Sequence, residues 1–327
     1  MILLVSNERD ITTDYVVLEL RRRGAPYFRL NSERLSDANV RCQWRSGRPD
    51  WQIVFADRGL VTSDVSAGYF RRPGAPSVKL SITDPAERHY CRDEWVAVLR
   101  SIYMTLDDRW LNSPANIARA EDKALQLAVA GESGLRIPPT VVTNDFDTAR
   151  SFMSEGATVG KAFHTGFLDD PEGQGGRVIF TTRLDDDNRP TRESLSVAPV
   201  IFQREIVKAY DVRATVVGQR VFAATIDSQI KAETTVDWRH GSYPDLPHAR
   251  HELPDDVASR CLSVVRLLGL RFAAIDLVLD RMGEYWFLEA NPNGQWAWIE
   301  NRTGLPISSA IVDELLAISA AHGNGAR

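Results

Sequence analysis

Lysine is scarce in this chain of 327 residues. Of its 39 basic residues only five are lysines, and these are Lys79, Lys123, Lys161, Lys208 and Lys231. The ammonium group of lysine is a compact charge that enters a phosphate pocket, whereas the guanidinium group of arginine is a planar fork. The positions that hold lysine are therefore the first candidates for phosphate contacts.

A positive net charge, paired cysteines and long apolar runs are also absent. The net charge is −5, which argues against nucleic acid as a partner. The three cysteines, Cys42, Cys91 and Cys261, are odd in number and too far apart for a disulfide framework or a zinc site. The first charged residue is Glu8, which leaves too short an apolar run for a signal sequence, and no later run approaches the roughly 18 residues of a membrane span. We therefore expect a cytoplasmic protein with no membrane partner.

The composition is that of an ordinary globular protein, with 43% apolar and 25% charged residues. Its length predicts two or three structural units of roughly 100–200 residues each. We place the units at 1–112, 113–198 and 199–327, because 110–114 interrupts a helical pattern and strands dominate from residue 199 onward. The mixture of helices and strands predicts an α/β (α+β) fold.

The chain is expected to open with a strand at 1–6, a helix at 13–23 and a strand at 27–30. No glycine-rich turn follows the first strand, which argues against a nucleotide site there. Residues 164–176 contain four glycines and three acidic residues and predict a mobile loop, and 183–196 is expected to be irregular. The other predicted helices are 85–106, 119–132, 146–154, 255–268 and 307–320, and the other predicted strands are 40–44, 52–55, 68–71, 138–142, 158–162, 177–182, 200–205, 211–217 and 220–228, with a hairpin at 272–290.

The hairpin concentrates oxygen ligands. A two-residue turn at Met282-Gly283 places Asp276 opposite Glu289 and Val278 opposite Phe287, with Asn291 on the face of Glu289. Two carboxylates among apolar neighbours repel each other, and a cation removes the conflict. Ligands that are all oxygen favour Mg²⁺ or Mn²⁺. The alternative is that one carboxylate pairs with an arginine while the other faces solvent.

Two further segments are candidates for nucleotide contacts. Lys161 ends a strand just before the glycine-rich loop, where a cation and loop amides hold phosphates, although exposed lysines are common without such a role. The strand 202–206 leads into a short connection whose backbone could meet an adenine edge. Asp211 beyond it could accept from ribose hydroxyls and shares a strand face with Arg213, and an ordinary surface ion pair is the competing interpretation.

The order of these features resembles the ATP-grasp superfamily, in which two α+β subdomains clamp ATP. The resemblance implies that the phosphates are contacted by Lys123 and Lys161. It also implies a nucleotide site and a site for two Mg²⁺ ions. The implied nucleotide contacts include Gln203, Arg204, Glu205, Ile206, Lys208 and Asp211, and the implied metal ligands are Asp276, Glu289 and Asn291.

More narrowly, the chain is similar to graspetide synthetases, the maturases of microviridin-type peptides. The matching stretches are YFRRP at 69–73, WLNSP at 110–114, DWR at 237–239 and FLEANPNGQW at 287–296. In this family the backbone of a hinge, here FQREI at 202–206, binds adenine. Arg204-Glu205 departs from the usual polar pair in this hinge, which puts in doubt only the side chain that touches ribose. The family implies an N-terminal pre-ATP-grasp α/β domain, a central subdomain and a C-terminal antiparallel-sheet subdomain, and homodimers are common in it.

The resemblance also implies the chemistry. ATP would phosphorylate a side-chain carboxylate of a precursor peptide, and a hydroxyl or amine of that peptide would attack the acyl phosphate to give an ω-ester or ω-amide ring. Closure of the loop 164–176 would exclude water. In this scheme Lys161, Arg213 and Arg239 are catalytic. The peptide contacts are Arg71, Arg72, Asp237 and Arg239, and the candidates for a general base are His164, His240 and Asp237.

Two other functions stay open. A ligase that joins free amino acids or tails a protein, similar to the glutathione synthetase and glutamate-ligase branches, shares the same ATP site. The RRP and DWR triplets argue against it. A nucleotide-binding regulator without catalysis is opposed by the complete set of metal ligands, which binding alone does not need.

Overall fold

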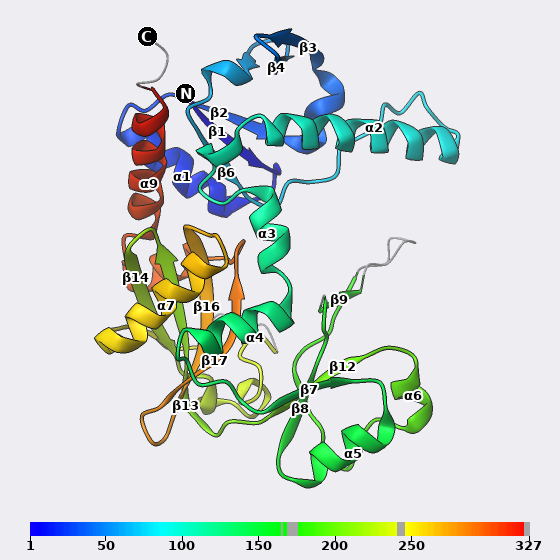
Figure 1. Ribbon diagram of the computed structural model, residues 1–327, viewed down its shortest axis with the longest axis vertical. Coiled ribbons are helices and arrows are strands. Elements are labelled where there is room, and N and C mark those ends of the chain that lie inside the picture. The colour runs from blue at the N-terminus through cyan, green and yellow to red at the C-terminus, as the bar shows by residue number, and fades with distance from the viewer. Residues whose placement is uncertain (165, 169–175, 241–245, 324–327) are drawn as a thin grey trace.

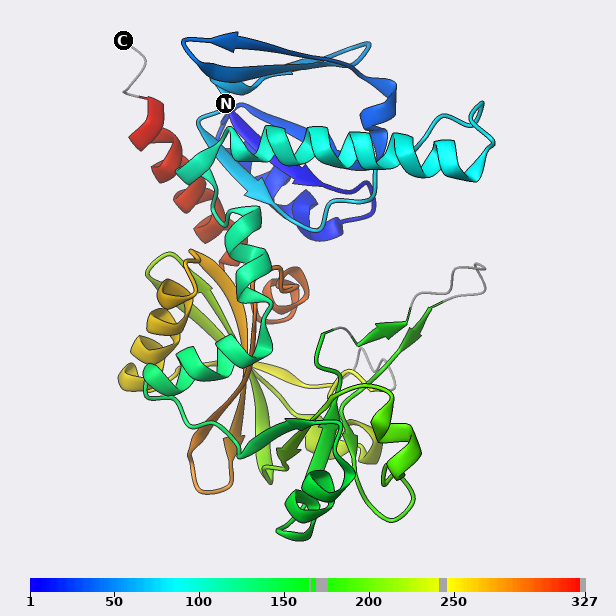
Figure 2. The same cartoon turned by 45° about the vertical axis from the view of Figure 1, so that its right-hand side comes forward.

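The computed structural model describes residues 1–164, 166–168, 176–240 and 246–323. The chain forms an N-terminal part, a central part and a C-terminal sheet, which are seen at the top, lower right and lower left of Figure 1 and again in Figure 2. In the described ranges no helix is both long and apolar enough to cross a membrane. Most of the loop predicted at 164–176 lies outside the described residues.

The N-terminal part contains a parallel sheet in the order β2-β1-β6 and a small antiparallel sheet in the order β3-β4-β5. Strand β1 is buried along its whole length, as expected for the central strand of a covered parallel sheet. The first half of helix α2 extends beyond the sheets (Figure 1), whereas Leu99 and Ile102 in its second half pack in the core of this part. The elements are β1 (Ile2–Ser6), α1 (Ile11–Arg22), β2 (Tyr27–Asn31), β3 (Asn39–Arg45), β4 (Arg48–Val54), β5 (Gly59–Val61), β6 (Ala67–Phe70) and α2 (Pro85–Met104).

The last helix of the chain packs on this first part. Helix α9 (Ile307–Gly323) places Ile311 and Leu315 in one hydrophobic core with Leu4 and Leu20. It runs beside α1 and β6, at the upper left of Figure 1. The first and last segments of the sequence therefore share a core, although the sequence assigns them to different units.

The central part is a four-stranded antiparallel sheet in the order β11-β8-β12-β7, with Ala149, Leu195 and Phe202 in its core. The sequence predicts one helix over 119–132, but two are present, because Asp122 caps a new helix by accepting from the N–H of Leu125 at 2.7 Å. The single strand predicted at 177–182 is also two short strands. The elements are α3 (Pro114–Ala120), α4 (Lys123–Glu132), β7 (Thr140–Thr143), α5 (Phe146–Ser154), β8 (Thr158–Lys161), β9 (Phe167–Leu168), β10 (Arg177–Val178), β11 (Thr182–Arg183), α6 (Arg192–Ser196) and β12 (Val200–Arg204).

The C-terminal sheet is antiparallel in the order β15-β14-β13-β16-β17. Helices α4 and α7 pack on this sheet, where Val129 and Val264 join Ile275 and Phe287 in one core. The sequence does not predict β15 or α8. The elements are β13 (Lys208–Val217), β14 (Arg220–Ile226), β15 (His248–His251), α7 (Asp255–Leu267), β16 (Phe272–Asp280), β17 (Tyr285–Asn291) and α8 (Ala297–Thr303).

The hairpin β16–β17 confirms the pairing of Asp276 with Glu289, although two of its details differ from the prediction. The N–H of Asp280 donates to the carbonyl of Glu284, so the loop has three residues, and Gly283 supplies its positive φ of 86°. This longer loop moves Val278 opposite Trp286 instead of Phe287. A β-bulge next to Asp276 then shifts the register back by one residue. The two deviations cancel at the carboxylates.

Candidate active site

A cavity of about 580 Å³ is lined by both the central sheet and the C-terminal sheet. This volume is within the range of small-molecule sites. The cavity collects all the predicted site residues except Arg71 and Arg213. The predicted residues in its wall are Arg72, Lys123, Lys161, Gln203, Arg204, Glu205, Ile206, Lys208, Asp211, Asp237, Arg239, Asp276, Glu289 and Asn291.

The facing carboxylates of Asp276 and Glu289 are the electrostatic centre of the cavity. Burial, together with the negative charge of Glu289, raises the pKa of Asp276, although Arg213 opposes the shift. Burial also acts to raise the pKa of Glu289, but Arg239 and Lys161 outweigh it and hold that pKa below its usual value. The pair therefore holds negative charge mainly on Glu289, and a cation would stabilise ionisation of both groups.

Asn291 completes the set of oxygen donors. It lies on the same strand as Glu289, and its Oδ1 accepts from the N–H of Asn293 at 2.9 Å, which orients the amide and leaves a second lone pair. Among the described residues no group of three or more His, Cys, Asp or Glu is arranged to hold a metal. A metal in this cavity would therefore need the amide oxygen as well as the two carboxylates, and these all-oxygen ligands fit Mg²⁺ or Mn²⁺.

Lys123 and Lys161 meet at one end of β8. The Nζ atom of Lys161 donates to Oε1 of Gln203 at 2.6 Å, and Nζ of Lys123 donates to the carbonyl of Ala162 at 2.6 Å. Gln203 is 3% exposed and is itself held by the hydroxyl of Thr140 at 2.9 Å. Both ammonium groups therefore stand at fixed points of the cavity wall, where an anionic ligand would meet them.

Lys161 should make nucleotide binding depend on pH. Burial lowers its pKa to about 8, so above that pH the free protein loses a charge that attracts phosphate. We expect the affinity for ADP to fall as the pH rises beyond 8, as measured by calorimetry. In Lys161→Arg the guanidinium stays charged, so this decline should disappear. A decline of equal size in that variant would assign the titration to another group.

The side chains of the predicted hinge turn toward neighbouring protein groups. Glu205 forms a two-point ion pair with Arg183, with a 2.7 Å contact from Nε. Arg204 donates to the carbonyl of Gly156 at 2.5 Å and lies over the ring of Phe152. The hinge can therefore contact an adenine edge through the N–H and C=O groups of its backbone.

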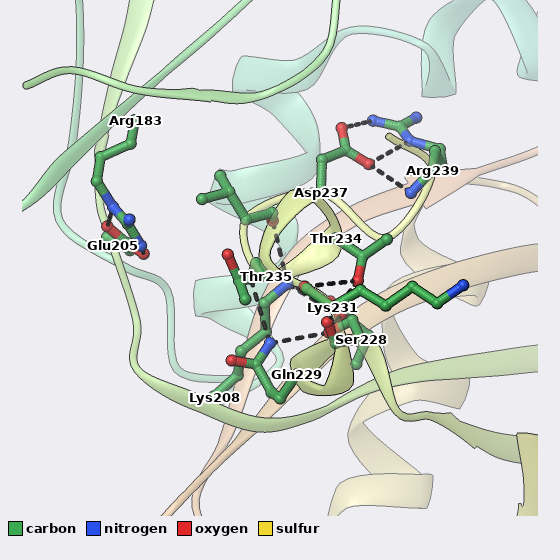
Figure 3. A network of polar contacts seen from close by, with 12 residues as sticks. Arg183, Glu205, Lys208, Ser228, Gln229, Lys231, Thr234, Thr235, Asp237 and Arg239 are labelled. Atoms are coloured by element: carbon green, nitrogen blue, oxygen red, sulfur yellow. Dashed lines mark hydrogen bonds and ion pairs between the residues drawn. The ribbon is translucent and has the colours of Figure 1, made fainter. Parts of the chain in front are cut away.

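Lys208 and Asp211 form a buried pair. Nζ of Lys208 lies 2.9 Å from both carboxylate oxygens of Asp211, and the hydroxyl of Ser228 donates to Oδ2 at 2.5 Å. Ser228, Gln229 and Thr234 extend this network toward the segment that carries Arg239 (Figure 3). Asp211 is 5% exposed, and its carboxylate already accepts three hydrogen bonds. Its role in the structure is to fix this corner of the cavity.

Asp237 and Arg239 also form a pair, shown in Figure 3. Nε and Nη2 of Arg239 donate to the two oxygens of Asp237 at 2.9 and 2.8 Å, and the N–H of Thr181 donates to Oδ2 at 3.1 Å. The hydrogen bond to Asp237 raises the pKa of Arg239. The side chain of Asp237 is 4% exposed and that of Arg239 is 51% exposed. Asp237 therefore orients the guanidinium, which is the group available to a ligand.

Arg213 is buried and does not line the cavity. Its Nη1 lies 3.0 Å from Oδ1 of Asp276, and its guanidinium lies beside the neighbouring rings of Trp238 and Trp298, at 5.8 and 5.9 Å from their centres. The resemblance implies a catalytic role for Arg213. In the structure its direct partner is Asp276, because the strand pairing places the two residues opposite each other.

The structure corrects the role predicted for Arg71. This side chain is 2% exposed, pairs with Asp10 at 3.0 Å and donates to the carbonyls of Asn293 and Gly294. It is therefore buried inside the protein and is not accessible to a peptide. Arg72 is exposed and lines the cavity, and its contact with a peptide stays a prediction.

Among the residues of the cavity wall that sequence reasoning missed are Glu121 and Gln126. Glu121 lines the cavity, and burial raises its pKa. Gln126 lines it from α4 and is 5% exposed. Neither follows a motif, although the i, i+3 spacing from Lys123 to Gln126 would have placed both on one face of the helix. Of the predicted bases, His164 lies at the cavity, whereas His240 contacts the carbonyl of Glu233 at the surface.

Comparison with known proteins identifies the fold. No protein-family model matches the chain. The RiPP-associated ATP-grasp ligase of Chryseobacterium gregarium, solved with ADP and a leader and core peptide, is 25% identical with a TM-score of 0.87, over 97% of this chain and 96% of that one. The macrocyclase MdnB of Microcystis aeruginosa is 31% identical with a TM-score of 0.78, over 96% of this chain and 98% of that one.

A curated relative, the probable alpha-L-glutamate ligase of Mannheimia succiniciproducens, is 27% identical over 207 residues, or 62% of this chain. The chain spans 65% of the length of that relative, just under two thirds. The fold and the nearly full-length matches define an ATP-grasp ligase. Within that class, the chain belongs to the graspetide synthetases.

Proposed function

We propose that this protein uses ATP to close ω-ester or ω-amide rings in a ribosomally made precursor peptide. The observation that carries the proposal is the single cavity in which the Asp276–Glu289 pair faces Lys123, Lys161 and Arg239. The macrocyclase MdnB, which is similar over nearly its whole length, supports the same class of reaction. The nucleotide would be ATP, consistent with the ADP in the Chryseobacterium structure.

The first step joins two anions. A carboxylate oxygen of the peptide attacks the γ-phosphorus of ATP, the bond to the bridging oxygen breaks, and ADP leaves. Lys123 and Lys161 offset negative charge on the phosphates, and Arg239, held by Asp237, would position the peptide carboxylate with its fork. Mg²⁺ (two ions, with Mn²⁺ as a substitute) bound to Asp276, Glu289 and Asn291 would supply further neutralisation.

The second step closes the ring. A hydroxyl oxygen or amine nitrogen of the same peptide attacks the acyl carbon, its proton passes to an acceptor, and inorganic phosphate leaves. The peptide loses the elements of one water for each ring. A dry cavity is needed because water would otherwise hydrolyse the acyl phosphate.

We further propose that leader and core peptide are recognised at this cavity by Arg72 and Arg239, which are exposed cations in its wall. The peptides in the Chryseobacterium ligase support a peptide partner. A homodimer, a cytoplasmic location and the division at residues 112 and 198 stay predictions.

The decisive experiment uses a short peptide rich in Thr or Ser and Asp or Glu, encoded beside this gene. With ATP and Mg²⁺, each ring should lower the peptide mass by about 18 Da, with one ADP formed per ring. Mass spectrometry and an ADP assay on the same sample measure both. If the peptide keeps its mass while free amino acids stimulate ADP formation, the proposal is wrong.

ADP formation that depends on free amino acids would favour the amino-acid ligase suggested by the glutamate-ligase relative. In this alternative the same ATP site would activate a free carboxylate or the end of a protein. The product would then gain the mass of an added residue instead of losing water, so the two reactions are separated by the sign of the mass change.

A further inference from the structure

The segment 290–294, which follows Glu289 and contains Asn291, has a hydrogen-bond donor at every backbone carbonyl. The carbonyl of Asn291 accepts from the N–H of Gly294 within the segment at 3.1 Å. The other four carbonyls are held by side chains that come from distant parts of the chain. The contact to Ala290 covers the edge of β17, which is the last strand of its sheet, and the other contacts hold the chain just beyond the end of this strand.

Gln126 makes the central contact. Its Oε1 accepts from the N–H of Ala290 at 2.9 Å, and its Nε2 donates to the carbonyl of Ala290 at 2.8 Å. Nε2 also donates to the carbonyl of Ala120 at 2.7 Å, so both polar atoms of the amide are satisfied. The side chain thus pairs with the outer edge of β17 as a neighbouring strand would, at the residue between Glu289 and Asn291.

Two other buried side chains hold the rest of the segment. Asn112 donates to the carbonyl of Pro292 at 3.1 Å and also contacts the backbone of Phe272 on β16. Arg71 donates to the carbonyls of Asn293 and Gly294 at 2.9 and 3.0 Å. Arg71, Asn112 and Gln126 are all buried, so these bonds are shielded from water.

We propose that Arg71, Asn112 and Gln126 are positioning residues that set the affinity of the site for its divalent cation. They contact this segment only through its backbone and would act by fixing the directions of Glu289 and Asn291. Because Lys123 precedes Gln126 by one turn of α4, the same contacts also fix a phosphate-binding lysine relative to the metal ligands. Removal of such supporting bonds lowers metal affinity about 10–100-fold in other metal sites. The inference rests on the proposed function, since it requires a cation at Asp276, Glu289 and Asn291.

The test measures Mn²⁺ binding to the full-length protein in the presence of ADP, by electron paramagnetic resonance of the free ion. Gln126→Leu keeps the size of the side chain and removes both amide groups. We expect its Mn²⁺ dissociation constant to rise at least about tenfold. The rate of ring formation at saturating Mn²⁺ should change much less than the Mn²⁺ concentration that gives half of the maximal rate. Arg71→Lys, which keeps a charge opposite Asp10 but loses the Nη1 group that donates to both carbonyls, should act in the same direction.

Asn116→Leu is the matched control, because Asn116 also uses its amide to hold a backbone carbonyl, that of Gly269, at 2.7 Å. It should leave Mn²⁺ affinity unchanged. Hydrogen exchange of the Ala290 amide in metal-free protein gives a second readout, and exchange should become faster in Gln126→Leu. If the original protein binds no Mn²⁺ with ADP, the proposed function fails. If it binds and both variants bind equally well, the positioning role is wrong.

Discussion

Glu289→Gln should abolish ring formation, with a loss of about 10³-fold or more in the rate at saturating ATP, about 4 kcal/mol of transition-state stabilisation. The change keeps the shape of the side chain but removes the charge that faces Asp276, Lys161 and Arg239. Without that charge the cavity loses a metal ligand, and Lys161 and Arg239 lose the anion that they face. Mass spectrometry of the peptide after single turnover measures the effect.

Glu284→Gln is the appropriate control for this substitution. Glu284 lies in the loop of the same hairpin and pairs with Arg136 at 2.9 Å, with about half of each side chain exposed. Exposed pairs of this kind contribute about 0–1 kcal/mol, so its activity should stay close to that of the original protein. Full activity in Glu289→Gln would show that the metal does not use this carboxylate.

Arg239→Ala should separate nucleotide binding from chemistry. We expect a loss of about 10²-fold or more in ring formation, because the fork held by Asp237 would no longer position the peptide carboxylate. Affinity for ADP should change by less than about threefold, since the phosphates have Lys123 and Lys161. Calorimetry with ADP and mass spectrometry of the peptide measure the two quantities on one preparation.

Arg220→Ala provides the comparison for Arg239→Ala. Arg220 is 44% exposed and also pairs with a carboxylate, that of Asp313 at 2.8 Å, but it lies on β14 away from the cavity. It should retain both ADP binding and ring formation. Arg239→Lys should recover only part of the activity, because one ammonium cannot form the two-point contact. If Arg239→Ala fails to bind ADP, the residue belongs to the nucleotide site instead.

The Asp276–Glu289 pairing could be predicted because a hairpin is a local structure. Two residues of one short segment face each other whenever the turn is placed nearly correctly, and an error in the loop length was offset by the bulge beside Asp276. The bulge itself has no clear signal in the sequence. Close to it β17 packs against α4, where Gln126 bonds to Ala290, 164 residues away.

Arg71 shows why a charged residue is hard to assign from its own neighbourhood. Two adjacent arginines at the end of a strand favour an exposed basic surface, and Arg72 is exposed. Arg71 is buried because Asp10, 61 residues earlier, neutralises it and two backbone carbonyls, more than 220 residues later, accept its hydrogen bonds. No local pattern contains these partners.

The amino-acid sequence was enough to predict most of the helices and strands, the hairpin that brings two carboxylates together, and the lysines that lie at the cavity. These features follow from residue periods of 2 and 3.6 and from short motifs, which act over a few residues. The tertiary structure alone decided that α9 completes the first core, that Arg213 and Asp237 turn to protein partners, and that Arg71, Asn112 and Gln126 hold the metal segment. The reason is that each of these choices depends on which distant groups satisfy a buried charge or a buried backbone group, and only the packed chain supplies those partners.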